Sequence, residues 1–277
     1  LKSAGIMLVT KIGPAVCRII SYRKMIEVLT EEAKNNPALF LCANPACEDC
    51  IKQRAALKPV FRLNQEDFKL AVSVPLSELN PESLNKYYDL DGIKYFELDL
   101  RNTKISEPNL REIATQIQPV KLQLSIINIG PKIDLIPVVT QLFNPSAVVI
   151  SGDIIPVAKQ ILWENTTERA AQALATIEKS GLRIAFNPAN FAAGKEKPFL
   201  DVYYFTNLKK HIGILYFVDG TFSGSPRYPV EGNGNLKELL SILRCHSFTG
   251  YVVIKSPDPG LGLDKCIARF WQALDEI

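Results

Sequence analysis

At 277 residues the chain is long enough for one large domain or two smaller ones, and its 47% hydrophobic and 22% charged residues are typical of a globular protein. Its 32 basic and 29 acidic residues give a net charge of +3, which is too balanced to predict nucleic acid or an anionic membrane as a partner. No apolar run approaches the roughly 20 residues that a membrane span needs. The apolar stretch 5–20 contains Lys11, Pro14 and Arg18 and ends without a cleavage site, so no signal peptide is expected.

The six cysteines are unevenly distributed, and three of them stand within nine residues. Cys42, Cys47 and Cys50 form a C-x4-C-x2-C pattern, and Cys17 is a candidate fourth sulfur. A secreted disulfide scaffold would be smaller and denser in cysteine, so the sequence favours the cytoplasm, with thiols that are reduced or bound to metal. Four thiolates fit structural zinc or an iron–sulfur cluster, and ordinary free thiols are the alternative.

Residues 1–68 are expected to form a small, mainly helical extension that carries this cysteine cluster. They include one charged amphipathic helix, "YRKMIEVLTEEAKNN", over residues 22–36. From residue 69 the pattern changes, and short runs rich in Val, Ile and Leu alternate with helical segments. Such runs, without strict polar alternation, are typical of parallel strands covered by helices. We expect strands over residues 69–76, 93–100, 121–128, 147–153, 182–188, 212–220 and 250–257.

Between these strands the sequence predicts helices, and together the units predict a (β/α)8 TIM barrel over residues 69–277. A doubly wound open sheet is the alternative, weakened by the lack of an early glycine-rich phosphate loop. Residues 189–197 are expected to be a loop, and residues 200–205 could be a strand or the start of a helix. Helices are expected over residues 80–90, 108–118, 134–143, 166–181, 234–246 and 263–277.

The last third of the chain resembles the end of the xylose isomerase-like TIM barrels, the sugar phosphate isomerase/epimerase superfamily. "YFVD" precedes a loop, "GNGNL" opens a helix and "FTGYVVIK" supplies the final strand, as in that family. "GIKYFELDL" resembles the family's second strand, with Glu97 in the matching place. The resemblance covers residues 70–277 and implies an isomerase or epimerase that acts on sugars or their phosphates.

Enzymes of this family hold a divalent metal ion with Glu, Asp and His side chains at the C-terminal ends of strands, where the metal polarises a hydroxy-ketone. Here the resemblance places Tyr216 at a histidine position, Lys255 at a glutamate position, and Asn187 at the end of the expected fifth strand, where a glutamate is usual. Neither His211 nor His246 ends a strand. No divalent metal is therefore expected at the barrel mouth, and the usual metal-dependent mechanism is not expected.

Two readings of the mouth remain open. In one, Lys255 forms a Schiff base or holds an anionic substrate, and Glu97, Asp99, Asp153 and Asp219 supply acid–base groups. In the other, a degenerate barrel binds a small polar or phosphorylated ligand, or a partner protein, and does no chemistry. If the protein is an enzyme, an isomerase, epimerase or lyase acting on a carbohydrate-like substrate is expected. The residues expected to bind the ligand are Asn187, Tyr216, Asp153, Arg101 and Arg227.

The "GNGN" segment, residues 232–235, offers glycines at the start of a helix, where free N–H groups favour anions. A tight turn with Asn235 as the helix cap is the alternative reading. The loop over residues 222–235 is where a partner protein is expected to bind, if one does.

Two other enzyme classes are alternatives. Radical SAM enzymes join a three-cysteine motif to a βα barrel, but their usual motif is C-x3-C-x2-C with an aromatic residue before the last cysteine. Here the first gap is four residues and Asp49 precedes Cys50. "YFELDLR" resembles type I dehydroquinase barrels, which need a histidine near a Schiff-base lysine, and neither histidine of this chain is placed for that role.

Overall fold

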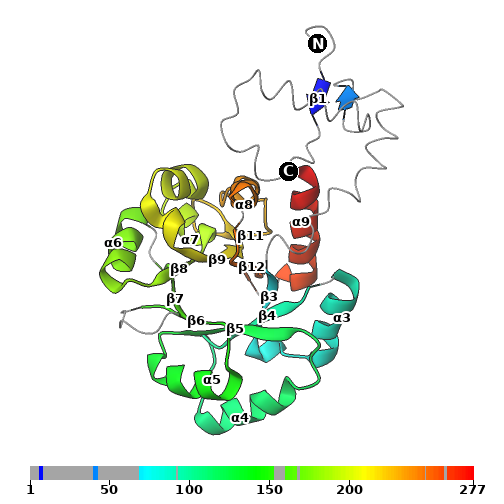
Figure 1. The fold of residues 1–277 in the computed structure, drawn as a ribbon, viewed down its shortest axis with the longest axis vertical. Coiled ribbons are helices and arrows are strands. Elements are labelled where there is room, and N and C mark those ends of the chain that lie inside the picture. The colour runs from blue at the N-terminus through cyan, green and yellow to red at the C-terminus, as the bar shows by residue number, and fades with distance from the viewer. Residues whose placement is uncertain are drawn as a thin grey trace.

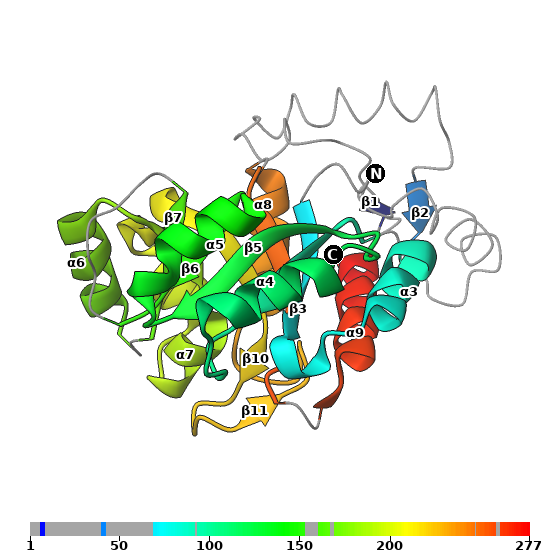
Figure 2. The same cartoon turned by 90° about the horizontal axis from the view of Figure 1, so that it is seen from below.

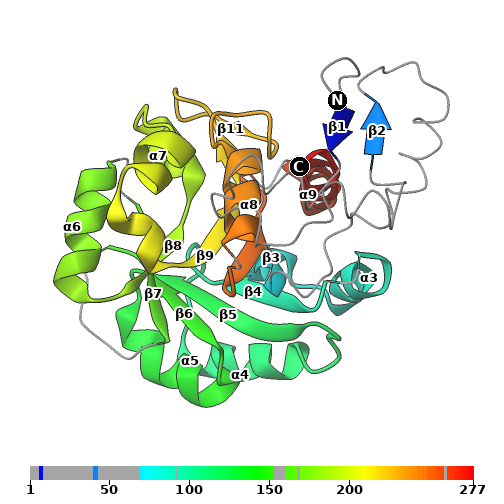
Figure 3. The ribbon, with the colours of Figure 1, turned by 45° about the horizontal axis from the view of Figure 1, so that its top comes forward.

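The computed structural model describes residues 6–8, 40–42, 69–91, 93–152, 160–166, 169–246, 248–258 and 261–277. In this part of the chain, eight parallel strands close into a barrel in the order β12-β3-β4-β5-β6-β7-β8-β9, as Figures 1 and 3 show. The predicted TIM barrel is confirmed, and the open sheet is wrong. The barrel strands are β3 (Lys69–Pro75), β4 (Tyr95–Asp99), β5 (Gln123–Gly130), β6 (Ala147–Ile150), β7 (Ile161–Glu164), β8 (Arg183–Phe186), β9 (Ile212–Phe217) and β12 (Tyr251–Ile254).

Helices connect the strands and surround them, as Figure 3 shows. Their apolar faces pack inward at helical spacing; α8, for example, buries Leu236, Leu239, Leu240 and Leu243. The longer helices are α3 (Pro81–Asp91), α4 (Glu107–Gln116), α5 (Ile136–Phe143), α6 (Ala170–Ser180), α8 (Leu236–Cys245) and α9 (Leu263–Glu276). Short helical turns are η4 (Leu76–Glu78), η5 (Ile133–Leu135) and η7 (Asn207–His211).

Two apolar clusters fill the structure, and the two-residue period of the strands separates them. One cluster joins alternate strand residues, such as Val72 and Phe96, to the buried faces of the helices. The other contains the strand residues whose side chains point to the opposite face of the sheet, such as Ala71, Ile126 and Val253. These side chains fill the barrel interior.

The structure differs from the sequence expectation in two places and decides a third, residues 200–205, that the sequence left open. β7 was not expected, although it is as long as β6, β8 and β12, because its apolar run covers only residues 161–163 and no glycine or proline directly precedes it. Residues 200–205 lie mainly in a π-helix, η6 (Pro198–Tyr204), and therefore do not form a strand. The expected loop at residues 189–197 contains a short helix, α7 (Pro188–Ala193), capped by the Asn187 side chain.

At the carboxyl end of the barrel, β10 (Asp219–Gly220) pairs antiparallel with β11 (Pro226–Arg227) in the loop that follows β9. Figure 2 shows this pair extending beyond the barrel strands. Elsewhere, β1 (Ile6–Leu8) pairs antiparallel with β2 (Phe40–Cys42). The helix expected at residues 22–36 lies outside the described residues. No helix in the described part of the chain is long and apolar enough to cross a membrane.

Candidate functional site

A layer of polar side chains lies at the carboxyl ends of the barrel strands. Strand residues two positions apart point the same way, and Ile126, Leu162, Ala185, Ile214 and Val253 all belong to the apolar barrel interior. The residues two positions further on therefore also point inward, but above that apolar layer. We call this layer the mouth; its members are Ser73, Glu97, Asp99, Asn128, Glu164, Asn187, Tyr216 and Lys255, together with Arg101, which reaches into it.

Glu97 is the most deeply buried carboxyl group of the mouth, with 0% of its surface exposed. The Ser73 hydroxyl donates a hydrogen bond to its Oε1 and the Tyr216 phenol donates to its Oε2, both at 2.6 Å. Burial raises the pKa of Glu97 above its ordinary value, against the opposing charge of Lys255. Burial also raises the pKa of Tyr216, so its phenol stays protonated. Burial thus favours the protonated form of Glu97, whereas Lys255 and the two hydrogen-bond donors favour the carboxylate.

Asp99, on the same face of β4, binds two cations. Lys255 Nζ lies 3.0 Å from its Oδ2, and the Arg101 guanidinium contacts both oxygens at 2.7–3.1 Å. Burial acts to raise the pKa of Asp99, but the charges of Lys255 and Arg101 outweigh burial and hold it below its ordinary value. Lys255 Nζ also lies 3.9 Å from Glu97 Oε1 and 4.9 Å from the centre of the Tyr216 ring. Asp99 is thus ionised, and Lys255 is its ammonium partner.

Glu164, at the end of β7, is the acceptor on the other side of the mouth. Arg101 Nη1 lies 3.3 Å from both of its oxygens. The side-chain amides of Asn128 and Asn187 donate to it at 2.9 and 3.1 Å. Asn128 also donates to the Tyr216 phenol oxygen at 3.1 Å. A continuous chain of hydrogen bonds therefore joins Glu97 to Glu164 through the phenol and one amide.

Asp219 lies in the rim loop and not in this layer. Its carboxylate accepts hydrogen bonds from the backbone N–H groups of Gly220, Val230, Gly232 and Gly234 at 2.8–3.0 Å. Burial raises its pKa, although these four donors act in the opposite direction. A Cβ added at Gly232 would lie 2.3 Å from Asp219 Oδ1, so this position needs glycine. An acid–base role for Asp219 stays a prediction, and these contacts weigh against it.

The same contacts explain the "GNGN" segment. The N–H groups of Gly232 and Gly234, which could have bound a phosphate, are taken by the chain's own carboxylate. Asn235 stands at the N-cap of α8 in a left-handed conformation, with φ of 53°, but its side chain makes no capping hydrogen bond. The segment therefore works as a turn and helix start, without the expected side-chain cap.

The mouth does not fit a divalent metal ion. Asp99 and Glu164 already share Arg101, and Lys255 occupies the space between Asp99 and Glu97. A metal at this point would compete with an ammonium group at contact distance. Among the described residues, no group of three or more His, Cys, Asp or Glu side chains is placed to hold a metal ion. The histidines are elsewhere: His211 ends η7, and Nδ1 of His246 lies 3.1 Å from the Tyr203 hydroxyl.

One correction concerns the expected loss of a carboxylate from the fifth strand. Counting from β3, the fifth strand of the barrel is β7, which ends in Glu164, and Asn187 follows the sixth strand. The fifth strand therefore keeps a glutamate at its carboxyl end. Glu164 was not among the expected site residues because β7 was not expected, although "ILWEN" places a charged residue directly after an apolar run.

Several other predicted site residues are not part of the mouth. Arg227 is exposed in β11 and donates to the Pro226 carbonyl. Cys42 ends β2. Cys245, at the end of α8, forms a disulfide bond, so the expectation of reduced or metal-bound thiols is wrong for this residue; Cys266 is free and buried. The predicted residues Asp153, Cys17, Cys47 and Cys50 lie outside the described part of the chain.

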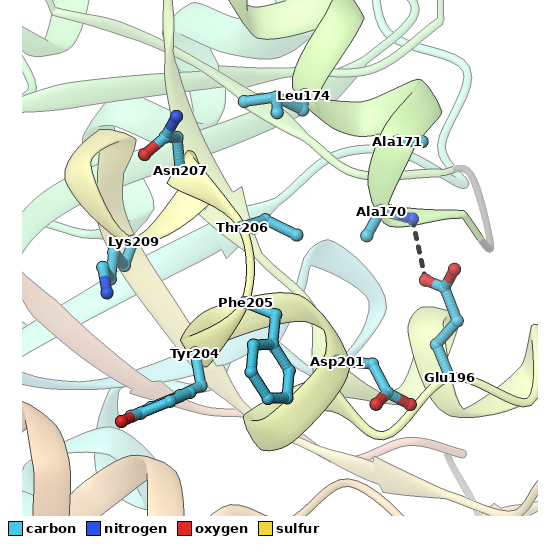
Figure 4. Close-up of a pocket in the computed structure, with 10 residues that line it drawn as sticks. All are labelled: Ala170, Ala171, Leu174, Glu196, Asp201, Tyr204, Phe205, Thr206, Asn207 and Lys209. Carbon is cyan, nitrogen blue, oxygen red and sulfur yellow. Dashed lines mark hydrogen bonds between the residues drawn. The ribbon is translucent and has the colours of Figure 1, made fainter.

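A cavity of about 510 Å³ lies on the flank of the barrel, between α6 and the segment that leads into β9. Figure 4 shows the Glu196 side chain reaching the backbone N–H of Ala170, which donates to it at 2.7 Å. Phe205 is 71% exposed. None of the predicted site residues lines this cavity, and none of its polar side chains belongs to the mouth network.

The barrel fold is similar to that of several solved structures of low sequence identity. A xylose isomerase domain protein from Planctomyces limnophilus matches 76% of this chain and 96% of its own, with a TM-score of 0.55 and 12% identity. A D-tagatose 3-epimerase-like protein matches 75% and 97%, with a TM-score of 0.53 and 15% identity. Endonuclease IV from Thermus thermophilus matches 75% and 99%, with a TM-score of 0.51 and 12% identity. No protein-family model and no curated protein sequence matches the chain.

Proposed function

We propose that the mouth binds a small, uncharged, hydroxyl-rich ligand without the help of a divalent metal ion. The observation that carries this proposal is the inward layer of carboxylates, amides, a phenol and two cations at the carboxyl ends of the strands. Barrels of this kind place their sites at that end. Hydroxyl groups can both donate and accept, so they match such a mixed layer better than an apolar ligand does. Fold neighbours named for xylose and tagatose agree with a carbohydrate-like ligand.

An uncharged ligand is favoured over a phosphorylated one. Lys255 and Arg101, the cations of the mouth, are already matched by Asp99 and Glu164. The rim N–H groups that could bind a phosphate are matched by Asp219. A phosphate would therefore have to displace an internal carboxylate, whereas a hydroxyl group can add to these oxygens as a further donor.

Enzyme chemistry through Lys255 is the second candidate, and Glu97 is the observation that favours it. This carboxyl has a raised pKa because of burial and lies 3.9 Å from Lys255 Nζ, so it could exchange a proton with a bound ligand. A Schiff base, however, needs an amine that is free to attack a carbonyl, and Lys255 Nζ lies in an ion pair 3.0 Å from Asp99 Oδ2. We therefore propose binding first, and isomerase or lyase activity only if a ligand separates Lys255 from Asp99.

The cysteine cluster stays a separate proposal. Zinc or an iron–sulfur cluster at Cys17, Cys42, Cys47 and Cys50 would serve as a staple outside the barrel. Radical SAM chemistry at the same cysteines is the less favoured use. Metal analysis of protein purified without oxygen, with a Cys47→Ser/Cys50→Ser variant as the control, separates these from incidental thiols.

Calorimetric titration with D-xylose, D-tagatose and D-xylulose 5-phosphate, all in EDTA, tests the binding proposal. We expect heat from at least one neutral sugar and weaker binding of the phosphate. Glu164→Gln should abolish this binding, because it replaces one of the two acceptor oxygens with an NH₂ donor and removes the charge that faces Arg101. Glu107→Gln, on the exposed side of α4, is the matched control and should bind normally. Preference for the phosphate, or equal loss in both variants, would overturn the proposal.

A further inference from the structure

We infer that Lys255 is a built-in cation that takes the place of a divalent metal ion between Glu97 and Asp99. Removing its ammonium group should turn the mouth into a divalent-cation site. This inference rests on the metal-independent binding proposed above and explains it, but its test needs no ligand.

The positions of the two carboxylates carry the argument. Glu97 and Asp99 stand two residues apart on β4, so both point into the barrel. Glu97 Oε1 and Asp99 Oδ2 both face Lys255 Nζ, at 3.9 and 3.0 Å. Two carboxylate oxygens that converge on one buried point are the arrangement that oxygen-preferring cations such as Mg²⁺ and Mn²⁺ use, with water completing the shell.

Lys255 comes from the last strand and reaches this point because of barrel closure. β12 pairs with β3, and β3 pairs with β4, so only β3 separates the end of β12 from the strand that carries the two carboxylates. The lysine is itself buried, with 8% of its surface exposed. Its charge is therefore poorly screened by solvent and interacts strongly with both acids.

Arg101 cannot replace Lys255 at this point. Its guanidinium lies on the other side of Asp99, where it bridges to Glu164. Without Lys255, Asp99 would keep one partner, but Glu97 would lose its nearest cation while remaining fully buried. The two neighbouring carboxyl groups would then need a new counter-charge, either a proton on Glu97 or a cation from solution held by both groups.

Mn²⁺ titration followed by electron paramagnetic resonance of the free ion is the test. Mn²⁺ prefers oxygen ligands, so the N-terminal cysteines should not interfere. Lys255→Arg keeps the positive charge and is the control, so we expect it and the wild type to bind equally little Mn²⁺. Lys255→Gln should bind about one ion per chain, because two carboxylates and water can hold one such ion. Lys255→Gln/Asp99→Asn, which removes one ligand, should return to the wild-type level.

Two results would overturn the inference. One is a folded Lys255→Gln that binds no more Mn²⁺ than the wild type. The other is binding that persists in Lys255→Gln/Asp99→Asn, because it would place the ion elsewhere. If Lys255→Gln does not fold, Lys255→Glu offers a second measurement: its unfolding temperature should rise when Mn²⁺ is added, and no rise would contradict the inference. A wild type that binds neutral sugars, together with a negative Mn²⁺ result, would leave the proposed function standing.

Discussion

Asp99 and Lys255 are separated by 156 residues in the sequence, and their side chains meet at 3.0 Å in the barrel mouth. Closure of the barrel between β12 and β3 makes this contact possible, because it brings the last strand next to the first. The pair, with Arg101 on its other side, gives the mouth its own internal cations. Carboxylates that would otherwise repel one another are held together by these charges.

Asp99→Asn tests this pairing through its dependence on pH. The substitution should cost about 3 kcal/mol of unfolding free energy at neutral pH, because it leaves the buried Lys255 without its carboxylate and Arg101 with only Glu164. Burial opposes the lowered pKa of Asp99, but Lys255 and Arg101 outweigh it. The stabilisation is therefore present above the ordinary carboxyl pKa and is lost as the pH falls toward the native-state pKa. Urea unfolding should show the difference between wild type and variant shrinking below about pH 4; a constant difference would contradict the ion-pair account.

Tyr216→Phe tests the hydrogen-bond chain between Glu97 and Glu164. The ring stays in place, while Glu97 loses one donor and Asn128 loses one acceptor. We expect a loss of about 1–2 kcal/mol in unfolding free energy, measured by urea denaturation. Tyr204→Phe is the matched control, because that side chain is 54% exposed, and it should change stability by less than about 0.5 kcal/mol. Equal effects of the two substitutions would rule out a special role for the Tyr216 hydroxyl.

Most of the barrel could be predicted from the sequence, because parallel strands that are buried on both faces form apolar runs. β7 could not, because its apolar run before Glu164 is only three residues long and no turn residue directly precedes it. Its absence from the prediction also shifted the strand count, and this is why Asn187 was assigned to the fifth strand and Glu164 was missed. Residues 189–204 were unclear for a related reason: "PANFAA" and "PFLDVYY" are apolar segments too short for periodicity to distinguish helix from strand.

The site was predictable in composition but not in its pairing. Period-2 alternation places Glu97 and Asp99 on one face, and the strand ends identify Asn187 and Lys255. Which side chains pair across the barrel depends on strand register, which includes irregular steps beside Glu97 and Asn128. Asp219 could not be assigned from the sequence either. It follows β9 by two residues, as a mouth residue would, but the loop that comes after it folds back and encloses its carboxylate.

Asp219→Asn tests that loop assignment. An amide offers one acceptor oxygen where the carboxylate accepts from four N–H groups, so some of these donors lose their partner. We expect a loss of about 3 kcal/mol in unfolding free energy and faster amide hydrogen exchange over residues 220–235. Exchange in β4 and β5 should stay close to that of the wild type. Unchanged exchange in the loop would show that Asp219 does not hold it.

The most direct test is whether sugar binding depends on a metal ion, measured by saturation-transfer NMR on a neutral ketose. Wild-type protein in EDTA should show transfer to the sugar, and added Mn²⁺ should not be needed for it; Glu164→Gln should show none. Transfer that appears only after a divalent ion is added would contradict the central claim, because the mouth would then depend on a metal that Lys255 is proposed to replace.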